Sequence, residues 1–234
     1  MSAAERRSRL LRLAAGAAFL ALAAVLVLIV VSATGNGDGG DTKLEGVPEV
    51  KELLTGIPQH GMLLGDPQAP VELIEFGDLQ CPICAGYSKE ILPPIMETRV
   101  RDGEVKLAFR NLTILGAESV VAGAAALAAG AQGHGWSFVE IFYRNQAEEE
   151  SGYADDEAFL KAIARAAGVH NLTKWQADRR QMTQKVEETT EEAHGLGFSG
   201  TPSFAIQGPQ TGEIQPLGSP GSTDSLESAI DAAG

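Results

Sequence analysis

The feature that most limits how this chain can fold is a pair of closely spaced cysteines. Of the 234 residues only two are cysteines, and both lie in the segment Cys81-Pro82-Ile83-Cys84. A scaffold with several disulfides, or a metal site with four thiolates, needs more cysteines than the chain has. Two thiols at this spacing can bond to each other, so we expect a fold built around one dithiol.

A strand is expected directly before the cysteines and a helix directly after them. Residues Val71–Phe76 (VELIEF) form a short, mostly apolar run, which is typical of a buried strand. From Cys84 to Val100, apolar side chains recur at helical spacing. Pro82 suits the first position of a helix, where a missing N–H costs little, so Cys81 becomes the N-cap residue.

The predicted N-cap position gives the first cysteine its own chemistry. There the Cys81 sulfur faces free backbone N–H groups and the positive end of the helix dipole. Both favour the thiolate and lower the pKa of the thiol. Cys84 lies one turn further in and is better shielded. We therefore predict that Cys81 attacks and is attacked, and that Cys84 resolves the mixed disulfide.

Half of a zinc site and an inert disulfide are the other interpretations of this motif. Zinc needs more ligands, and the four histidines are scattered without ligand spacing, at His60, His134, His170 and His194. An inert bridge that closes so short a loop would constrain the unfolded chain very little. The sequence therefore predicts a redox-active pair, with no metal and no cofactor.

Glu75 is the second informative residue, because it interrupts the apolar strand six positions before Cys81. Strand alternation places it on the same face as Val71 and Leu73. A carboxyl group there is partly desolvated, which raises its pKa. It can then exchange protons with the inner thiol, Cys84. The alternative is a glutamate at the end of the strand that reaches solvent.

The N-terminus has the pattern of a membrane-targeting segment. Residues 13–31 hold 19 uncharged, small or apolar side chains, and a helix of that length spans about 29 Å, close to the thickness of a bilayer core. Arginines precede it at positions 6, 7, 9 and 12, which holds the N-terminus in the cytoplasm. We favour an uncleaved anchor over a signal peptide cleaved near 31–33, because the run exceeds a usual signal core.

The remaining boundaries follow from composition. Residues 1–34 are the anchor or signal segment, and 35–60, which open with GNGDGG, are expected to be a flexible linker. A weak helical pattern at 47–54 is given no role. The folded domain is expected at 61–234, outside the cytoplasm, where disulfides persist. Its net negative charge, −13 for the whole chain, repels phosphate backbones and argues against nucleic-acid binding.

The rest of the domain alternates predicted strands with a long helical region. Strands are expected at 104–109, 203–207 and 213–217, and helices at 120–131, 155–167, 172–182, 186–196 and 223–233. Thr201-Pro202 is a candidate cis peptide, since X–Pro bonds carry a small cis penalty. Asp78, in the loop before the cysteines, is interpreted as a structural turn residue.

Together these pieces resemble the thioredoxin superfamily, and most of all the DsbA-like oxidoreductases of the membrane-anchored BdbD type. The matching motifs are Gly65-x-x-x-Ala69-Pro70-Val71, Glu75-Phe76-x-Asp78-x-x-Cys81-Pro82-x-Cys84, Gln132-Gly133 with Trp136 and Asn145-Gln146, and Gly200-Thr201-Pro202-Ser203-Phe204. The resemblance covers about 61–232. It implies an α/β thioredoxin-like fold with a helical insertion at about 112–197, preceded by one N-terminal transmembrane helix.

The resemblance also implies site residues. A cis Pro202 would pack beside the cysteine pair, the Thr201 backbone would pair with an extended substrate chain, and the Thr201 side chain would tune the thiols. Pro82 and Ile83, between the cysteines, are further candidates for substrate binding. Glu75 matches the buried acid of the family.

One position departs from DsbA, which has a histidine where this chain has Ile83. An isoleucine carries no charge and donates no hydrogen bond. Cys81 must then rely on the helix terminus and the backbone, which leaves its oxidising strength open.

We therefore expect a membrane-anchored, extracytoplasmic thiol–disulfide oxidoreductase that introduces disulfides into exported proteins by exchange at Cys81–Cys84. Its expected partners are exported proteins with free thiols and, by the resemblance, a membrane-embedded, quinone-linked reoxidant. Three alternatives stay open. The same residues could act as a reductase or isomerase, could hold a metal such as copper in a metal or assembly chaperone, or could be incidental to a scaffold.

Overall fold

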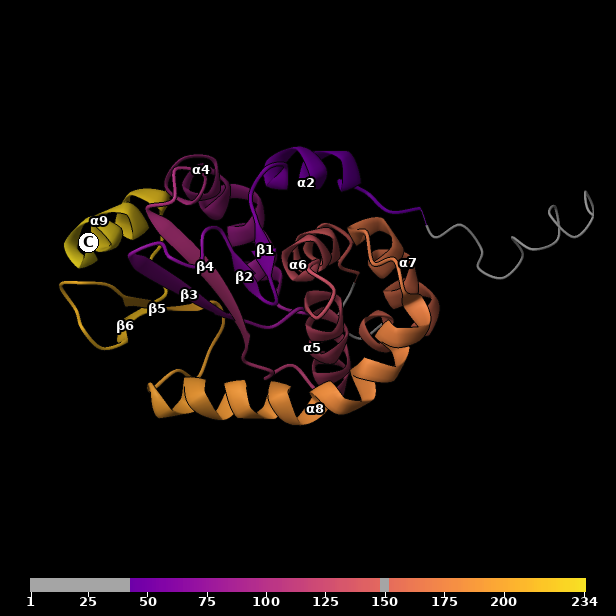
Figure 1. Cartoon of the computed structure of the whole chain (residues 1–234). Coiled ribbons are helices and arrows are strands. Elements are labelled where there is room, and N and C mark those ends of the chain that lie inside the picture. The colour runs from indigo at the N-terminus through magenta and orange to yellow at the C-terminus, as the bar shows by residue number, and fades with distance from the viewer. Residues whose placement is uncertain (1–42, 148–151) are drawn as a thin grey trace, which may run out of the picture. The chain divides into compact units, whose positions relative to one another are not determined.

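The computed structural model describes residues 43–147 and 152–234 (Figure 1). The predicted membrane segment at 13–31 and the start of the predicted linker lie outside these residues. Within the described ranges, no helix combines the length and the apolar character needed to cross a bilayer.

A mixed sheet forms the centre of the described domain. Its strands are β1 (Gln59–His60), β2 (Leu63–Leu64), β3 (Val71–Gly77), β4 (Val105–Asn111), β5 (Ser203–Gln207) and β6 (Gln215–Gly218). Over the described ranges they lie in the order β1-β2-β4-β3-β5-β6. Strands β3 and β4 pair in parallel, and the other neighbours pair antiparallel. The predicted thioredoxin-like α/β fold is confirmed, and β3 lies near the middle of the sheet.

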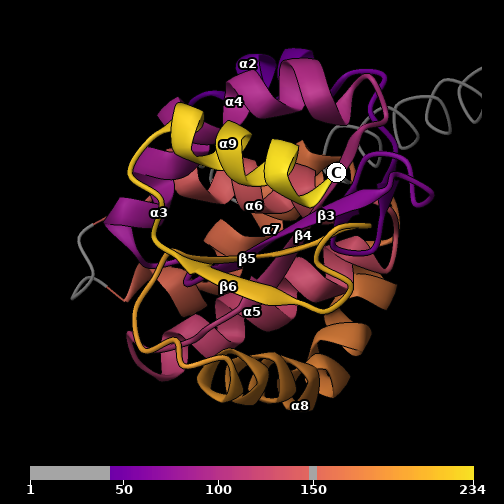
Figure 2. The same cartoon turned by 90° about the vertical axis from the view of Figure 1, so that its left-hand side faces the viewer.

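The side chains of β3 alternate between two apolar layers, as the strand pattern predicts. Leu73 belongs to the layer that also holds Leu226 of α9 (Thr223–Ala233). Ile74 and Phe76 belong to the opposite layer, together with Ala193 of α8 (Leu172–Gly195). Figure 2 shows α9 and α4 over one face of the sheet and α8 over the other. Both faces of β3 are therefore covered by apolar side chains.

The helical insertion lies between β4 and β5, as predicted. It comprises α5 (Ala117–Gly130), α6 (Gly135–Arg144), the short turn η4 (Tyr153–Asp155), α7 (Glu157–Ala167) and α8. The prediction of separate helices at 172–182 and 186–196 is wrong, because α8 runs through both as one helix of 24 residues. No glycine or proline separates the two patterns, so nothing ends the first helix.

The domain also begins earlier than the sequence indicates. Helix α2 (Val47–Leu54) buries Val50, Leu53 and Leu54, and it packs against α6. Asn145, just after α6, donates to the Glu45 carbonyl oxygen (3.0 Å) and accepts from the Glu45 N–H (2.7 Å). The described part of the expected flexible linker, 43–60, is therefore folded, and the expected start at Gly61 falls inside the β1–β2 hairpin.

The helix after the cysteines is continuous but irregular. It consists of α3 (Pro82–Gly86), the π-helical turn η1 (Tyr87–Ile91), α4 (Leu92–Ile95) and the π-helical turn η2 (Met96–Val100). Two prolines, Pro93 and Pro94, lie between the wide turns. A proline has no N–H to donate, so the helical ladder shifts around the pair instead of breaking.

Asp78 fixes the loop that leads from β3 to this helix. Its fully buried carboxylate accepts from the backbone N–H groups of Gln80 (2.9 Å), Ile114 (2.9 Å) and Leu115 (3.1 Å). It also accepts from the Ser119 hydroxyl (2.7 Å). One side chain thereby ties the loop before the cysteines to the loop that enters the insertion, in keeping with its predicted structural role.

We predict that Asp78→Ala lowers the free energy of unfolding by about 3 kcal/mol, since it leaves several buried hydrogen-bond donors without a partner. Asp66→Ala is the matched control, because Asp66 accepts from Gln68 N–H (2.8 Å) in the same i→i+2 arrangement but is exposed. The control should cost no more than about 0.5 kcal/mol. Urea unfolding of both variants measures the difference, and equal losses would contradict the assignment.

Candidate active site

Cys81 occupies the N-cap of the active-site helix, where the sequence places it. Its backbone is extended (φ −72°, ψ 118°), and its Sγ accepts a hydrogen bond from the backbone N–H of Cys84 at 3.3 Å. The thiol also lies 3.5 Å from the carbonyl oxygen of Thr201. Both cysteines are free thiols in this structure.

The surroundings of Cys81 favour its thiolate. The hydrogen bond from the Cys84 thiol is the largest cause, the Thr201 side chain and the backbone N–H groups of Cys84 and Ile83 add to it, and burial opposes it. Together they lower the pKa of the Cys81 thiol to about 6. At neutral pH this sulfur is therefore an anion, which is the nucleophilic form of cysteine.

The environment of Cys84 has the opposite effect. Its side chain is fully buried. Burial, followed by its interactions with Cys81 and Glu75, raises the pKa of the Cys84 thiol well above its ordinary value. The pair therefore consists of an outer thiolate and an inner thiol, an asymmetry that fits the predicted attacking and resolving roles.

The loop before β5 lies beside this pair. The Thr201–Pro202 peptide is cis, as the resemblance implies. Pro202 is buried, Cys81 is 4% exposed, and Thr201 is the partly exposed residue of the loop beside the sulfur. The hydroxyl of Ser203 donates to the carbonyl oxygen of Gly200 (2.7 Å) and closes the turn.

Glu75 lies inside the protein, and the alternative of a glutamate that reaches solvent is wrong. The residue is 2% exposed. Neither of its carboxyl oxygens has a hydrogen-bond partner among the described residues. Burial, followed by repulsion from Glu140 and from Cys81, raises the pKa of the Glu75 carboxyl well above its usual value. The group is therefore a buried acid next to the dithiol.

The two residues between the cysteines point outward. Pro82 is exposed, and Ile83 is 60% exposed, which is unusual for a large apolar side chain. They place an apolar surface on the first turn of the helix, directly beside Cys81.

Sequence reasoning missed a second buried acid, Glu140 of α6. The residue is fully buried, and its Oε2 accepts from the Ser88 hydroxyl (2.9 Å) and from the Arg144 guanidinium (2.5 Å). A signal was present, because Glu140 follows Trp136 by four residues and precedes Tyr143 by three, on the apolar face of the helix.

Helix α6 also supports the loop that carries Cys81. The Gln146 side chain donates to the carbonyl oxygens of Leu79 (2.7 Å) and Cys81 (3.1 Å). The Tyr143 hydroxyl donates to the carbonyl oxygen of Asp78 (3.3 Å). The insertion therefore takes part in building the site.

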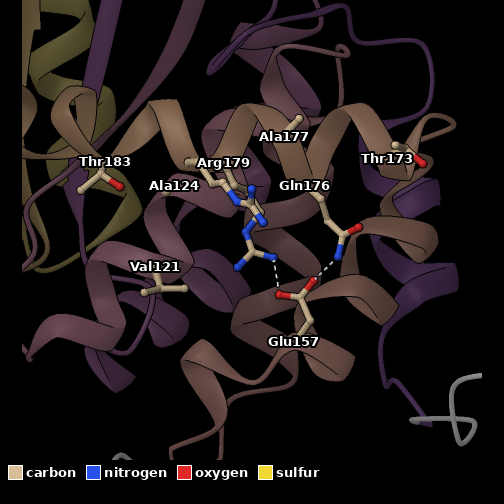
Figure 3. A pocket seen from close by; sticks show the side chains of 9 residues that line it. Val121, Ala124, Glu157, Thr173, Gln176, Ala177, Arg179 and Thr183 are labelled. Carbon is tan, nitrogen blue, oxygen red and sulfur yellow. Dashed lines mark hydrogen bonds and ion pairs between the residues drawn. The ribbon is translucent and has the colours of Figure 1, made fainter.

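A polar cleft of about 450 Å³ lies elsewhere in the insertion (Figure 3). There the Glu157 carboxylate accepts from Gln176 (2.6 Å) and Arg179 (2.8 Å). None of the predicted site residues lines this cleft. Across the described residues, no three His, Cys, Asp or Glu side chains are grouped so that they could hold a metal ion.

Comparison with known proteins identifies the family. A family model described as thioredoxin matches residues 58–232. The chain belongs to the thioredoxin family. A protein of Bacillus anthracis named "Probable disulfide bond formation protein D" is 28% identical over 172 residues, which cover 72% of this chain and 76% of that protein. The expected membership of the DsbA-like thiol–disulfide oxidoreductases is thereby confirmed.

Solved structures agree in fold. Oxidised BdbD from Bacillus subtilis superposes with a TM-score of 0.62 at 22% identity, over 76% of this chain and 96% of that one. A thioredoxin-like oxidoreductase from Silicibacter pomeroyi gives a TM-score of 0.59 at 28% identity, over 78% of this chain and 96% of that one.

We predict that alkylation of Cys81 in the reduced protein rises with pH around a midpoint of about 6. Cys84→Ser keeps a hydrogen-bond donor beside the sulfur, whereas Cys84→Ala removes it, so the midpoint should be higher in the alanine variant. Alkylation rates followed by mass spectrometry measure both. A midpoint near that of free cysteine, about 8.5, would contradict the site geometry.

We also predict that Glu75 lowers the free energy of unfolding by an amount that depends on pH. Its folded pKa lies above its unfolded pKa, so the cost is absent below the unfolded value of about 4.3 and grows as pH rises toward the folded value. Relative to Glu75→Gln, the reduced wild type should therefore lose stability over that range. Urea unfolding at a series of pH values measures this, and Glu213→Gln serves as an exposed control. Parallel curves for wild type and Glu75→Gln would contradict the prediction.

Proposed function

We propose that this protein is a membrane-anchored, extracytoplasmic oxidase that introduces disulfides into exported proteins by exchange at Cys81–Cys84. The observation that carries this proposal is the position of Cys81 at the helix N-cap, where its Sγ accepts from the Cys84 N–H at 3.3 Å and the thiolate is favoured. An enzyme whose reduced form is stabilised gives up its disulfide readily, so it oxidises other thiols.

The lowered pKa of Cys81 corresponds to an appreciable free energy. The drop in the Cys81 pKa from 9.0 to about 6 corresponds to roughly 4 kcal/mol of preference for the thiolate. At pH 7 an ordinary thiol is still protonated, so only about one unit of this drop stabilises the reduced form, which is roughly 1.4 kcal/mol or roughly 30 mV toward a more oxidising potential. Burial raises the pKa values of the Cys84 thiol and of the Glu75 carboxyl, so both groups favour the uncharged form that does not oppose this preference.

The exchange proceeds in two balanced steps. A substrate thiolate attacks Cys81 Sγ, the Cys81–Cys84 bond breaks, and its electron pair leaves on Cys84 Sγ, which takes a proton from Glu75. A second substrate thiolate then attacks the substrate sulfur of the mixed disulfide. Cys81 departs as its stabilised thiolate, the substrate leaves with a disulfide, and the enzyme has gained two electrons.

Substrate binding is assigned to the surface around Cys81. The Thr201 backbone, next to Pro202, would pair with an extended segment of substrate, because Thr201 is the partly exposed residue of this loop beside the sulfur. Pro82 and Ile83 would contact the apolar side chains of the same segment. Such contacts recognise an unfolded chain without demanding a particular sequence.

The anchor and the reoxidant complete the proposal. The apolar run at 13–31, preceded by arginines, supports a single span with the catalytic domain outside the cytoplasm, or its release there if the segment is cleaved. The two electrons must leave before another cycle. The resemblance to membrane-anchored BdbD-type proteins supports a quinone-linked membrane partner that receives them.

We predict that Cys84→Ala, expressed in the full-length chain, accumulates mixed disulfides with exported proteins on Cys81. The Cys81 thiolate attacks a disulfide of an exported protein and releases one of its two sulfurs as a thiolate, and no second thiol of the enzyme remains to displace the bound protein. Mass spectrometry of the captured adducts identifies the substrates. Cys81→Ala is the matched control and should capture none.

The equilibrium potential of the dithiol separates the oxidase from the reverse activities. An oxidase should be more oxidising than about −200 mV. A value near about −270 mV, as in thioredoxin, would support the reductase instead.

A further inference from the structure

The buried acid on α6, Glu140, is hydrogen-bonded to the helix that carries the resolving cysteine. Ser88 follows Cys84 by four residues in the active-site helix, so the two side chains occupy one helical face a turn apart. The Ser88 hydroxyl donates to Glu140 Oε2 at 2.9 Å. Glu140 therefore contacts the active-site helix from the helical insertion. Glu75 approaches the dithiol from β3, near enough to Glu140 for their charges to repel.

The two acids differ in their partners. Arg144 donates to Glu140 Oε2 at 2.5 Å and to the Glu140 carbonyl oxygen at 3.1 Å. Its side chain is 13% exposed, whereas that of Glu140 is fully buried. Among the described residues, Glu140 Oε1 and both oxygens of Glu75 have no hydrogen-bond partner. One acid thus has a cation beside it, and the other has none.

This difference decides which acid is charged. Two interacting carboxyl groups in a dry site do not ionise together, and a neighbouring cation favours ionisation of the group it touches. Burial raises the pKa of the Glu140 carboxyl above its usual value, and Arg144 and Ser88 oppose that rise. Repulsion from Glu140 raises the pKa of Glu75 further, after burial. Three further groups face Glu75: Cys81, which repels a charge on it, the Cys84 thiol, and the Tyr143 hydroxyl of α6.

We propose that Glu140 is a positioning residue for thiol–disulfide exchange: its carboxylate, fixed by Arg144 and Ser88, holds the exchangeable proton on Glu75. The inference rests on the proposed function and deepens it. When the Cys81–Cys84 bond breaks, the proton moves from Glu75 to Cys84 Sγ. When Cys84 attacks again during reoxidation, its proton returns to Glu75, because a second carboxylate beside Glu140 is unfavourable.

The test is the pH dependence of the first exchange step. A reduced peptide dithiol is mixed with the oxidised full-length chain, and the rate at which the Cys81–Cys84 disulfide opens is measured from acid to alkaline pH. Divided by the thiolate fraction of the peptide at each pH, the rate should fall as Glu75 loses its proton. In Glu140→Gln, which keeps the shape but not the charge, the midpoint of this fall should move down by about one pH unit.

A matched control comes from the polar cleft in Figure 3, where Glu157 also bonds to an arginine and a glutamine. Glu157→Gln removes the charge of a similar arginine pair far from the cysteines in sequence, and it should leave the midpoint unchanged. If Glu140→Gln does not fold, Arg144→Gln replaces it. Without its cation, Glu140 competes for the proton, so the midpoint should again fall.

The decisive comparison uses Glu75→Gln as a second background. If Glu140 acts through the proton on Glu75, Glu140→Gln shifts the midpoint only when Glu75 is present. An unchanged midpoint, or the same shift in both backgrounds, overturns the inference while the wild type still exchanges disulfides. A wild-type chain that never forms a mixed disulfide on Cys81 overturns the proposed function instead.

Discussion

The hydrogen bond from the backbone N–H of Cys84 to the sulfur of Cys81 (3.3 Å) is the contact on which the rest of the site depends. It exists because Pro82 begins the helix and leaves Cys81 at the N-cap, where unpaired amides point at the sulfur. The same helix carries Cys84 one turn inward, into the apolar core, where its side chain is fully buried. Cys81 and Cys84 are only three residues apart, but their surroundings differ. The amides favour the thiolate of Cys81, and burial favours the thiol of Cys84.

The helical insertion is part of this arrangement and not an appendage to it. Through Gln146 and Tyr143 it holds the carbonyl groups of the loop from Asp78 to Cys81, and Asp78 holds the first loop of the insertion in return. Neither unit can shift without breaking buried hydrogen bonds of the other. The position of the Cys81 sulfur against the Thr201 loop is therefore fixed by contacts between segments that lie far apart in the sequence.

Sequence reasoning located the features that have local causes. The apolar run of β3, the proline at the helix start and the Gly-Thr-Pro turn each carry their signal within a few residues. It failed where the cause is distant. Helix α2 is weak by pattern, and it folds because α6 covers Val50, Leu53 and Leu54. The two-residue strands β1 and β2 are too short for any alternation to appear. Glu140 was overlooked because its importance comes from Ser88, 52 residues away, and not from its neighbours.

Four side chains that can lose a proton lie close together in the site. Their surroundings determine which of them carry a negative charge. Cys81, Cys84, Glu75 and Glu140 all lie in a dry region, where each additional negative charge is costly. Negative charge is stabilised on two of these groups: backbone amides face the Cys81 sulfur, and the Arg144 guanidinium faces the Glu140 carboxyl. Cys84 and Glu75 favour their protonated forms, because burial outweighs the one backbone donor at Cys84, from Asp78, and no described residue bonds to the oxygens of Glu75. Breaking the disulfide creates charge at Cys84, and a proton held nearby on Glu75 removes it at once. The opposed pKa shifts of these groups are thus one arrangement, set by which of them a donor or cation can reach.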